Sequence, residues 1–240
     1  MGKTKATIYQ YKNVKTKPPD IIWHLPTCRT TPCNCNKIEY IYQTKYLGVI
    51  LNTNLNWGEH SLYQQNKLRK LNYLMYHTRH VLPKKMRLKI YKAFYEPVLH
   101  YGIECWGGAA DYILQPIKIL LKYAVRTLVG ANRSDHTKPI FTSLKILPLE
   151  GLYERALVSA LHREAEKEVT YQPTTQHYQT RNHQKFRPPK KWLNKKARRQ
   201  VNYAIPYHFS NLPQELIEKL GQKSFHKELK SFLLQKYSMG

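Results

Sequence analysis

Three of the four cysteines stand close together and are the residues best suited to metal chemistry. They form the pattern Cys28-x4-Cys33-x-Cys35, and His24 precedes the first thiol by four residues. Zinc prefers thiolate and imidazole ligands, but structural zinc sites usually take two ligand pairs that are separated along the chain. Cys105, the remaining cysteine, lies in a distant helical stretch. We therefore expect a reduced hairpin loop and assign no metal ligand, with a zinc site as the alternative.

Residues for other kinds of catalysis do not form a recognisable pattern. The chain has no glycine-rich phosphate loop, no G-x-S-x-G and no H-E-x-x-H. Metal-dependent phosphoryl transfer needs clustered carboxylates, but the three aspartates are far apart in the sequence: Asp20, Asp111 and Asp135. The glutamates at positions 164, 166 and 168 alternate along a helical stretch, so they face different sides and fit a solvated surface. We assign no catalytic residue and expect no cofactor in this chain.

The charge of the chain points to a polyanionic partner. Forty Lys and Arg against fifteen Asp and Glu give the 240 residues a formal net charge of +25. Such self-repulsion is of little use to an enzyme of small metabolites, and it is relieved best by nucleic acid, with an anionic membrane as the second candidate. Residues 1–120 hold 18 basic and 6 acidic groups and residues 121–240 hold 22 and 9, so a detachable basic tail is excluded.

Targeting features are absent from the sequence. No apolar run reaches the roughly 18 residues that a transmembrane helix needs, and the polar start at Met1 lacks the apolar core of a signal peptide. Four cysteines without such a peptide indicate a reducing compartment. We expect a nuclear or cytoplasmic ribonucleoprotein that is not secreted.

Two groups of basic residues have spacings that suit nucleic acid. Lys118, Lys122 and Arg126 repeat every four residues on one side of a predicted helix, which matches successive phosphates, although a solvated face has the same pattern. Residues 169–214 contain nine Lys or Arg, no acidic residue and interleaved aromatic rings that can stack on bases. A nuclear import signal around residues 195–199 and an inert linker are the alternatives for this segment.

Short strands and amphipathic helices must position these side chains. Residues 6–11, 38–42 and 46–51 are β-branched and aromatic and predict strands, separated by prolines and polar runs. After Trp57 the apolar residues recur with helical spacing. We expect one helix up to Pro83, a second from Lys84 to Gly107 that is kinked at Pro97, and a third that stops at Gly130. Further helices are expected near residues 152–168 and 225–233.

The predicted fold is therefore α+β and mostly α. The expected segments are a strand-rich module at 1–56, a helical bundle at 57–168, a basic aromatic segment at 169–214 and a terminal amphipathic helix at 215–240.

Several of these segments resemble a known protein family. The run Lys45-Tyr46-Leu47-Gly48-Val49, then Leu55-Asn56-Trp57 and His60, is similar to the reverse transcriptases of non-LTR, LINE-type retrotransposons, especially the jockey-like elements. The resemblance continues in order at residues 95–107, 122–126, 144–149, 180–182, 211–213 and 225–233. It covers most of the chain, and Asn52 departs from it because the family usually has Asp there.

The resemblance implies the C-terminal part of an RNA-directed DNA polymerase. It implies a strand-rich palm remnant, a helical thumb bundle and a basic C-terminal segment. The family's catalytic aspartates would lie upstream of Met1, and Mg²⁺ is expected only in the intact polymerase. Tyr46, Leu47 and Gly48 would form the strand that supports the primer end, and Lys3 would stand near the nucleotide phosphates. The expected nucleic-acid contacts are Lys118, Lys122, Arg126, Arg133, Arg181, Lys185, Arg187, Lys195, Lys196, Arg198 and Arg199.

We expect this chain to bind RNA and DNA, as a primer–template duplex or template RNA, without polymerising. A domesticated or structural nucleic-acid-binding protein is the alternative function. The preference for RNA or DNA and the oligomeric state stay open.

Overall fold

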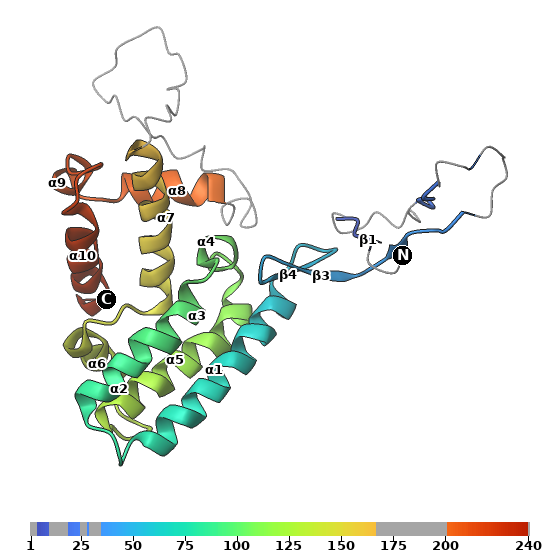
Figure 1. The fold of residues 1–240 in the computed structure, drawn as a ribbon. Coiled ribbons are helices and arrows are strands. Elements are labelled where there is room, and N and C mark those ends of the chain that lie inside the picture. The colour runs from blue at the N-terminus through green and yellow to red at the C-terminus, as the bar shows by residue number, and fades with distance from the viewer. Residues whose placement is uncertain (1–3, 10–18, 25–27, 29–34, 167–200, 240) are drawn as a thin grey trace, which may run out of the picture. The chain divides into compact units, whose positions relative to one another are not determined.

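The computed structural model describes residues 4–9, 19–24, 28, 35–166 and 201–239, and the chain divides into two compact units, residues 1–63 and 64–240. All the strands described lie in the first unit, and the second is helical (Figure 1). The prediction of an α+β, mostly α fold is confirmed. Lys3 and the predicted contacts from Arg181 to Arg199 lie outside the described residues. Within the described ranges, no helix is both long enough and apolar enough to cross a membrane.

The first unit contains two small sheets. Strand β1 (Lys5–Ala6) pairs in parallel with β2 (Glu39–Tyr40), and β3 (Gln43–Tyr46) pairs antiparallel with β4 (Val49–Asn52). An isolated antiparallel bridge joins Ile22 to Lys37. The described strands are shorter than those predicted, and residues 10 and 11 of the first predicted strand lie outside the described residues.

The strand predicted over residues 46–51 is divided between β3 and β4 by a turn at Leu47 and Gly48. Tyr46 ends β3, and Leu47 and Gly48 have φ angles of 44° and 79°. Two successive positive φ values are the signature of a type I′ turn, the two-residue connection that matches the twist of a hairpin. Glycine adopts a positive φ easily, but leucine does so only at an energetic cost. Because leucine is therefore not a turn signal, the apolar run looks like one continuous strand in the sequence. Leu47 lies at the hairpin tip with 72% of its surface exposed.

The segment after β4 is held by two buried polar side chains. The amide oxygen of Asn52 accepts the backbone N–H of Asn56 at 3.0 Å, and its Nδ2 donates to Oδ1 of Asn56 at 2.7 Å. Nδ1 of the buried His60 accepts the backbone N–H of Ile50 at 3.2 Å. Asn52 therefore has a turn-forming role here, through both its amide oxygen and its amide nitrogen.

We expect Asn52→Ala to open the β3–β4 region locally. The substitution removes the acceptor of the Asn56 N–H, and a part-buried hydrogen bond of this kind contributes about 0.5–1.5 kcal/mol. Hydrogen exchange of that amide should then be about two- to tenfold faster. Asn54→Ala is the matched control, because the Asn54 side chain makes only an exposed contact to Tyr42 at 3.4 Å. Equal exchange rates in both variants would contradict this account.

The second unit begins along α1 (Gly58–Thr78), and the helix expected next is interrupted twice. It consists of α2 (Lys84–Ile90), the π-helical turn η1 (Tyr91–Tyr95), α3 (Glu96–His100) and α4 (Ile103–Trp106). The N–H of Glu96 reaches back to the carbonyl of Tyr91, so one extra residue is accommodated just before Pro97. A break that was not predicted separates α3 from α4 at Gly102, which has a φ of 62°, and α4 ends just before Gly107, where the helix was expected to stop.

The remaining helices complete one core. They are α5 (Asp111–Val129), α6 (Thr137–Leu144), α7 (Leu149–Glu166), α8 (Val201–Ser210), α9 (Gln214–Ile217) and α10 (Phe225–Met239). As predicted, α5 stops at Gly130, which has a φ of 75°. Helix α7 packs against α3, α4, α8 and α10, and α10 also covers α6 (Figure 1). Phe225, Leu229 and Leu233 are fully buried on α10, as the sequence predicted.

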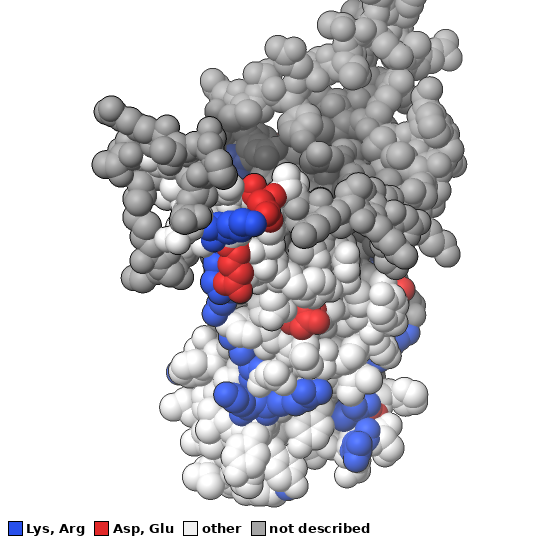
Figure 2. Space-filling model, turned by 90° about the vertical axis from the view of Figure 1, so that its right-hand side faces the viewer, with Lys and Arg blue, Asp and Glu red and all other residues white. Residues whose placement is uncertain are grey.

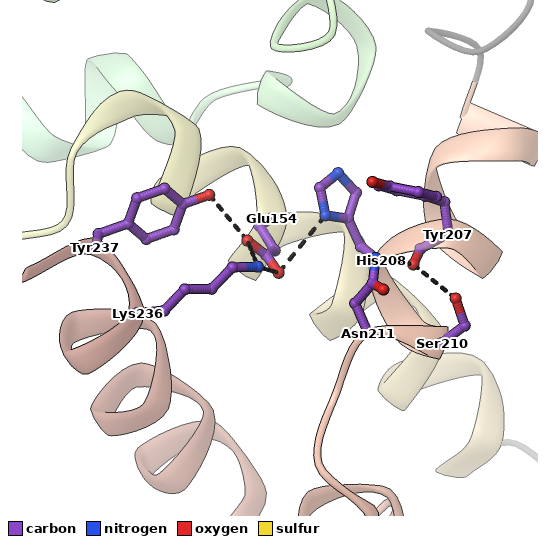
Figure 3. A network of polar contacts seen from close by, with 7 residues as sticks. All are labelled: Glu154, Tyr207, His208, Ser210, Asn211, Lys236 and Tyr237. Carbon is purple, nitrogen blue, oxygen red and sulfur yellow. Dashed lines mark hydrogen bonds and ion pairs between the residues drawn. The ribbon is translucent and has the colours of Figure 1, made fainter. Parts of the chain in front are cut away.

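A buried carboxylate joins α7, α8 and α10 (Figure 3). Glu154 of α7 is fully buried, and its carboxylate accepts hydrogen bonds from Lys236 Nζ at 2.6 and 2.9 Å and from Tyr237 OH at 2.9 Å. His208 Nδ1 of α8 lies 3.6 Å away. Burial alone would raise the pKa of Glu154, but the hydrogen bonds and charges of His208 and Lys236 outweigh it and lower this pKa to about 2. Glu154 is therefore ionised at neutral pH and holds three helices together.

Candidate nucleic-acid interface

An open groove between α1 and α5 combines aromatic rings with positive charge. Its volume is about 300 Å³. The lining residues are Arg69, Asn72, Tyr73, Tyr76, Leu120 and Tyr123. Asn72 is buried and its Nδ2 donates to the carbonyl oxygen of Leu120 at 3.1 Å, so it fixes α1 against α5. The aromatic side chains beside it are therefore presented on a rigid support.

Two tyrosines of the groove are exposed, and one of them stacks on the third, the half-buried Tyr123. Tyr73 and Tyr76 are 69% and 42% exposed. The rings of Tyr76 and Tyr123 stack with their centroids 6.4 Å apart and their planes inclined by 25°. The guanidinium carbon of Arg79 lies 3.4 Å from the centroid of the Tyr76 ring. Exposed rings next to cations form the kind of platform on which unpaired bases stack.

The charge around the groove is positive. Residues 60–95 contain nine Lys or Arg and no acidic residue. Lys67, Arg69 and Lys70 are exposed on α1, and the guanidinium of Arg69 donates to the neutral amide oxygens of Asn66 and Gln65 at 3.1 and 3.2 Å. In the lower part of the face shown in Figure 2, Lys and Arg gather with almost no Asp or Glu beside them. A phosphate chain would meet little repulsion here.

Sequence reasoning did not find this groove, although one signal for it was available. The acid-free run over residues 60–95 is as basic as the one over 169–214, since each contains nine Lys or Arg. Arg69, Tyr73 and Tyr76 also follow one another at helical spacings of four and three residues. The contribution of Tyr123 from α5 depends on tertiary packing and has no sequence signal.

The predicted basic stripe on α5 is only partly available for phosphates. Lys118 forms ion pairs with Glu150 at 2.6 Å and Asp111 at 3.3 Å, and only 18% of its side chain is exposed. Burial opposes its charged form, but these carboxylates outweigh burial and raise the pKa of Lys118. The structure therefore does not support Lys118 as a phosphate contact. Its charge is already balanced within the fold.

The other predicted contacts near α5 differ in exposure. Lys122 and Arg133 are exposed. Arg126 is half-buried, and its Nε donates to the carbonyl oxygen of Asp135 at 2.9 Å. Lys122 also lines, with Lys138, a second cavity of about 370 Å³ between α5, α6, α7 and α10. Lys122 and Arg133 thus keep the exposure that a phosphate contact needs.

Metal-ligating residues gather at one place among the described residues. His24, Cys28 and Cys35 each offer a ligand atom, and these atoms all lie within 4.8 Å of one another. No group of carboxylates with comparable geometry occurs in the part of the chain that the structure describes. The sequence spacing argued against a metal site, but the fold brings these three residues together.

Comparison with known proteins relates half of this chain to retrotransposon polymerases. It is 32% identical over 123 residues to the RNA-directed DNA polymerase from mobile element jockey of Drosophila funebris, and 29% identical over 124 residues to the jockey polymerase of Drosophila melanogaster. The probable RNA-directed DNA polymerase from transposon X-element of Drosophila melanogaster is 28% identical over 105 residues. The chain resembles non-LTR retrotransposon polymerases. This resemblance confirms the family predicted from the sequence, over about half of the chain where most of it was expected.

The related region is limited in extent. The matches to the two jockey polymerases cover 50% of this chain but 13% of each relative, and the X-element match covers 42% of this chain and 12% of that relative. No protein-family model matches the chain. No solved structure matches it either.

Proposed function

We propose that this chain is part of an RNA-directed DNA polymerase of a non-LTR retrotransposon and that it binds the polymerase's nucleic acid. The groove between α1 and α5 carries this proposal, because the exposed Tyr73 and Tyr76 meet the exposed Arg69 there. The polymerases named among its relatives and the net charge of +25 support the same conclusion.

In the proposed complex, unpaired nucleotides of the template RNA occupy the groove. Their bases stack on the exposed ring of Tyr73 and on the Arg79–Tyr76 pair, where the guanidinium that covers the Tyr76 ring meets the base, and each such contact is worth about 1–3 kcal/mol. Arg69 and Lys70 face the phosphates. Arg79, which already covers the ring of Tyr76, adds positive charge at the same end of α1.

The two units correspond to different regions of the proposed polymerase. The helical unit acts as the thumb, with Lys122 and Arg133 on backbone phosphates. The β3–β4 hairpin acts as the end of the palm and presents Tyr46, Leu47 and Gly48 at its tip, towards the primer end. The Arg181–Arg199 segment contacts RNA or target DNA, and Lys3 stands near the nucleotide phosphates. The catalytic aspartates and their Mg²⁺ belong to another part of the polymerase.

Salt titration of binding tests the electrostatic part of this proposal. We expect the affinity of the full chain for single-stranded RNA, measured by fluorescence anisotropy, to fall steeply with salt. The log–log slope should be about −0.7 for each neutralised phosphate on single strands and about −0.9 on a duplex. With several phosphates bound, the affinity should fall at least tenfold between low and physiological salt. An affinity that is independent of salt would contradict the proposal.

A polymerisation assay tests the assignment of the chemistry. We expect no incorporation when the chain is given a primer–template, deoxynucleotides and Mg²⁺, because two-metal transfer needs carboxylates gathered around the ions. Incorporation above a control without protein would show that this chain holds metal ligands that the proposal places elsewhere.

A further inference from the structure

The cysteine-bearing segment of the first unit has the geometry of a metal site. We propose that His24, Cys28 and Cys35 bind a zinc ion. Cys28 and Cys35 are thiols, and their sulfur atoms and a ring nitrogen of His24 lie within 4.8 Å of one another. Two thiolates and one imidazole form a mixed sulfur and nitrogen ligand set, which favours zinc over the hard cations that prefer oxygen.

Backbone register places two of the three ligands opposite each other. The antiparallel bridge pairs Ile22 with Lys37, and the N–H of Trp23 donates to the carbonyl oxygen of Asn36 at 3.0 Å. Continuing this register by one step places His24 directly across from Cys35. Directly opposed residues on antiparallel strands have Cβ atoms about 4.5–5.5 Å apart, which suits two ligands of one ion.

Further contacts hold together the two segments that carry His24 and Cys35, which are residues 19–24 and residues 35–40. The N–H of Ile38 donates to the carbonyl oxygen of Ile21 at 2.9 Å, and Lys37 Nζ forms an ion pair with Asp20 at 2.6 Å. Tyr40 OH donates to the carbonyl oxygen of Pro19 at 2.6 Å. Several backbone and side-chain interactions between these two segments therefore fix the positions of His24 and Cys35.

The ligand distances leave only a small closure to be made on binding. Zinc–sulfur bonds of about 2.3 Å in a tetrahedron place the ligand atoms roughly 3.8 Å apart. The observed limit of 4.8 Å is about 1 Å larger, which side-chain rotation can close. Cys33 lies outside the described residues, so the site is stated with three ligands.

An ion bound at this site would stabilise the fold of the first unit. Every hydrophobic side chain buried in the described part of the chain lies between Leu68 and Leu233, in the second unit. The described residues of the first unit bury Asn52, His60 and Ser61, which are polar. Small modules without an apolar core are commonly stabilised by a metal, whose binding energy becomes folding energy.

Metal analysis of the full chain tests this inference. Protein produced in the presence of zinc and passed through a desalting column should retain one zinc per chain by elemental mass spectrometry. After removal of zinc and addition of Co²⁺, it should show thiolate-to-cobalt charge transfer and the visible absorption of tetrahedral cobalt. The cobalt spectrum is measured on the wild-type chain, so it does not depend on the folding of any variant.

Single substitutions then locate the ion. His24→Ala, Cys28→Ser and Cys35→Ser should each lower zinc retention at least tenfold. Cys105→Ser is the matched control, because this exposed thiol lies in the second unit, and it should retain wild-type zinc. Wild-type protein without zinc or without cobalt–thiolate absorption would overturn the inference. Equal zinc in the Cys35→Ser and Cys105→Ser variants would overturn it as well.

Discussion

Replacing Glu154 by Gln should lower the free energy of unfolding of the chain by about 2–3 kcal/mol. Removing one partner of a fully buried ion pair usually costs about 3–5 kcal/mol, and the loss is smaller here because the side chain of Lys236 is 38% exposed and water can solvate its charge. Here the group left behind is the ammonium of Lys236, which donates to both carboxylate oxygens at 2.6 and 2.9 Å. Tyr237 and His208 lose a charged partner too (Figure 3).

The effect should depend on pH in a defined direction. The pKa of Glu154 is lowered to about 2 in the folded chain, from an ordinary value of 4.5. A lowered pKa means that ionised Glu154 stabilises the fold fully above pH 4.5 and loses this contribution as the pH falls towards 2. The shift corresponds to roughly 3 kcal/mol. The difference in stability between wild type and Glu154→Gln should therefore shrink across this acid range.

Urea denaturation followed by circular dichroism measures both effects. Glu150→Gln is the matched control, since Glu150 lies on the same helix but is 47% exposed in its ion pair with Lys118. In this control Lys118 keeps a second carboxylate partner, Asp111 at 3.3 Å, so the loss should be about 1 kcal/mol or less. Equal losses in the two variants, or a Glu154→Gln effect that does not change with pH, would contradict the role assigned to the buried carboxylate.

The double substitution Tyr73→Ala/Tyr76→Ala should weaken binding of single-stranded RNA by about 30-fold or more. Two lost stacking contacts at about 1–3 kcal/mol each give at least about 2 kcal/mol, and every 1.4 kcal/mol is tenfold in affinity. The tyrosines carry no charge, so the dependence of binding on salt should stay the same. Arg69→Ala should instead reduce the magnitude of the log–log slope by about 0.7.

This contrast separates stacking from unspecific attraction by a chain of charge +25. Tyr112→Ala is the matched control, because Tyr112 is 79% exposed on α5 and does not line the groove. It should bind RNA as the wild type does. Fluorescence anisotropy at several salt concentrations gives both the affinity and the slope. Wild-type affinity in the double variant would exclude the groove as the binding surface.

The sequence predicted most helices of the second unit because their apolar periodicity and their stop signals are local. Gly130 ends α5 where expected, and α10 buries the expected face. The interruption at Tyr91–Tyr95 was not predictable in form, because a kink at Pro97 can be absorbed in several ways and tertiary packing selects the π turn. Helix α6 was missed because Thr137–Leu144 is too short to give a clear period.

The sites were less predictable than the fold because they depend on pairings between distant residues. The turn at Leu47–Gly48 was not predicted from the sequence because leucine rarely adopts a positive φ. The grouping of His24 with Cys35 follows from a bridge between Ile22 and Lys37 that no local pattern reveals. Phe209, one of the aromatic residues of the 169–214 segment that we described as able to stack on bases, is instead buried in the core through α8.

Ultraviolet crosslinking of single-stranded RNA to the full chain, followed by mapping of the crosslinked peptides, tests the central claim most directly. Aromatic side chains that stack on bases crosslink efficiently because the two ring systems are in contact. We predict crosslinks at Tyr73 and Tyr76 on α1 and at Tyr123 on α5, which together line the groove. Crosslinks found only outside these two helices would contradict the assignment of the groove as the nucleic-acid interface.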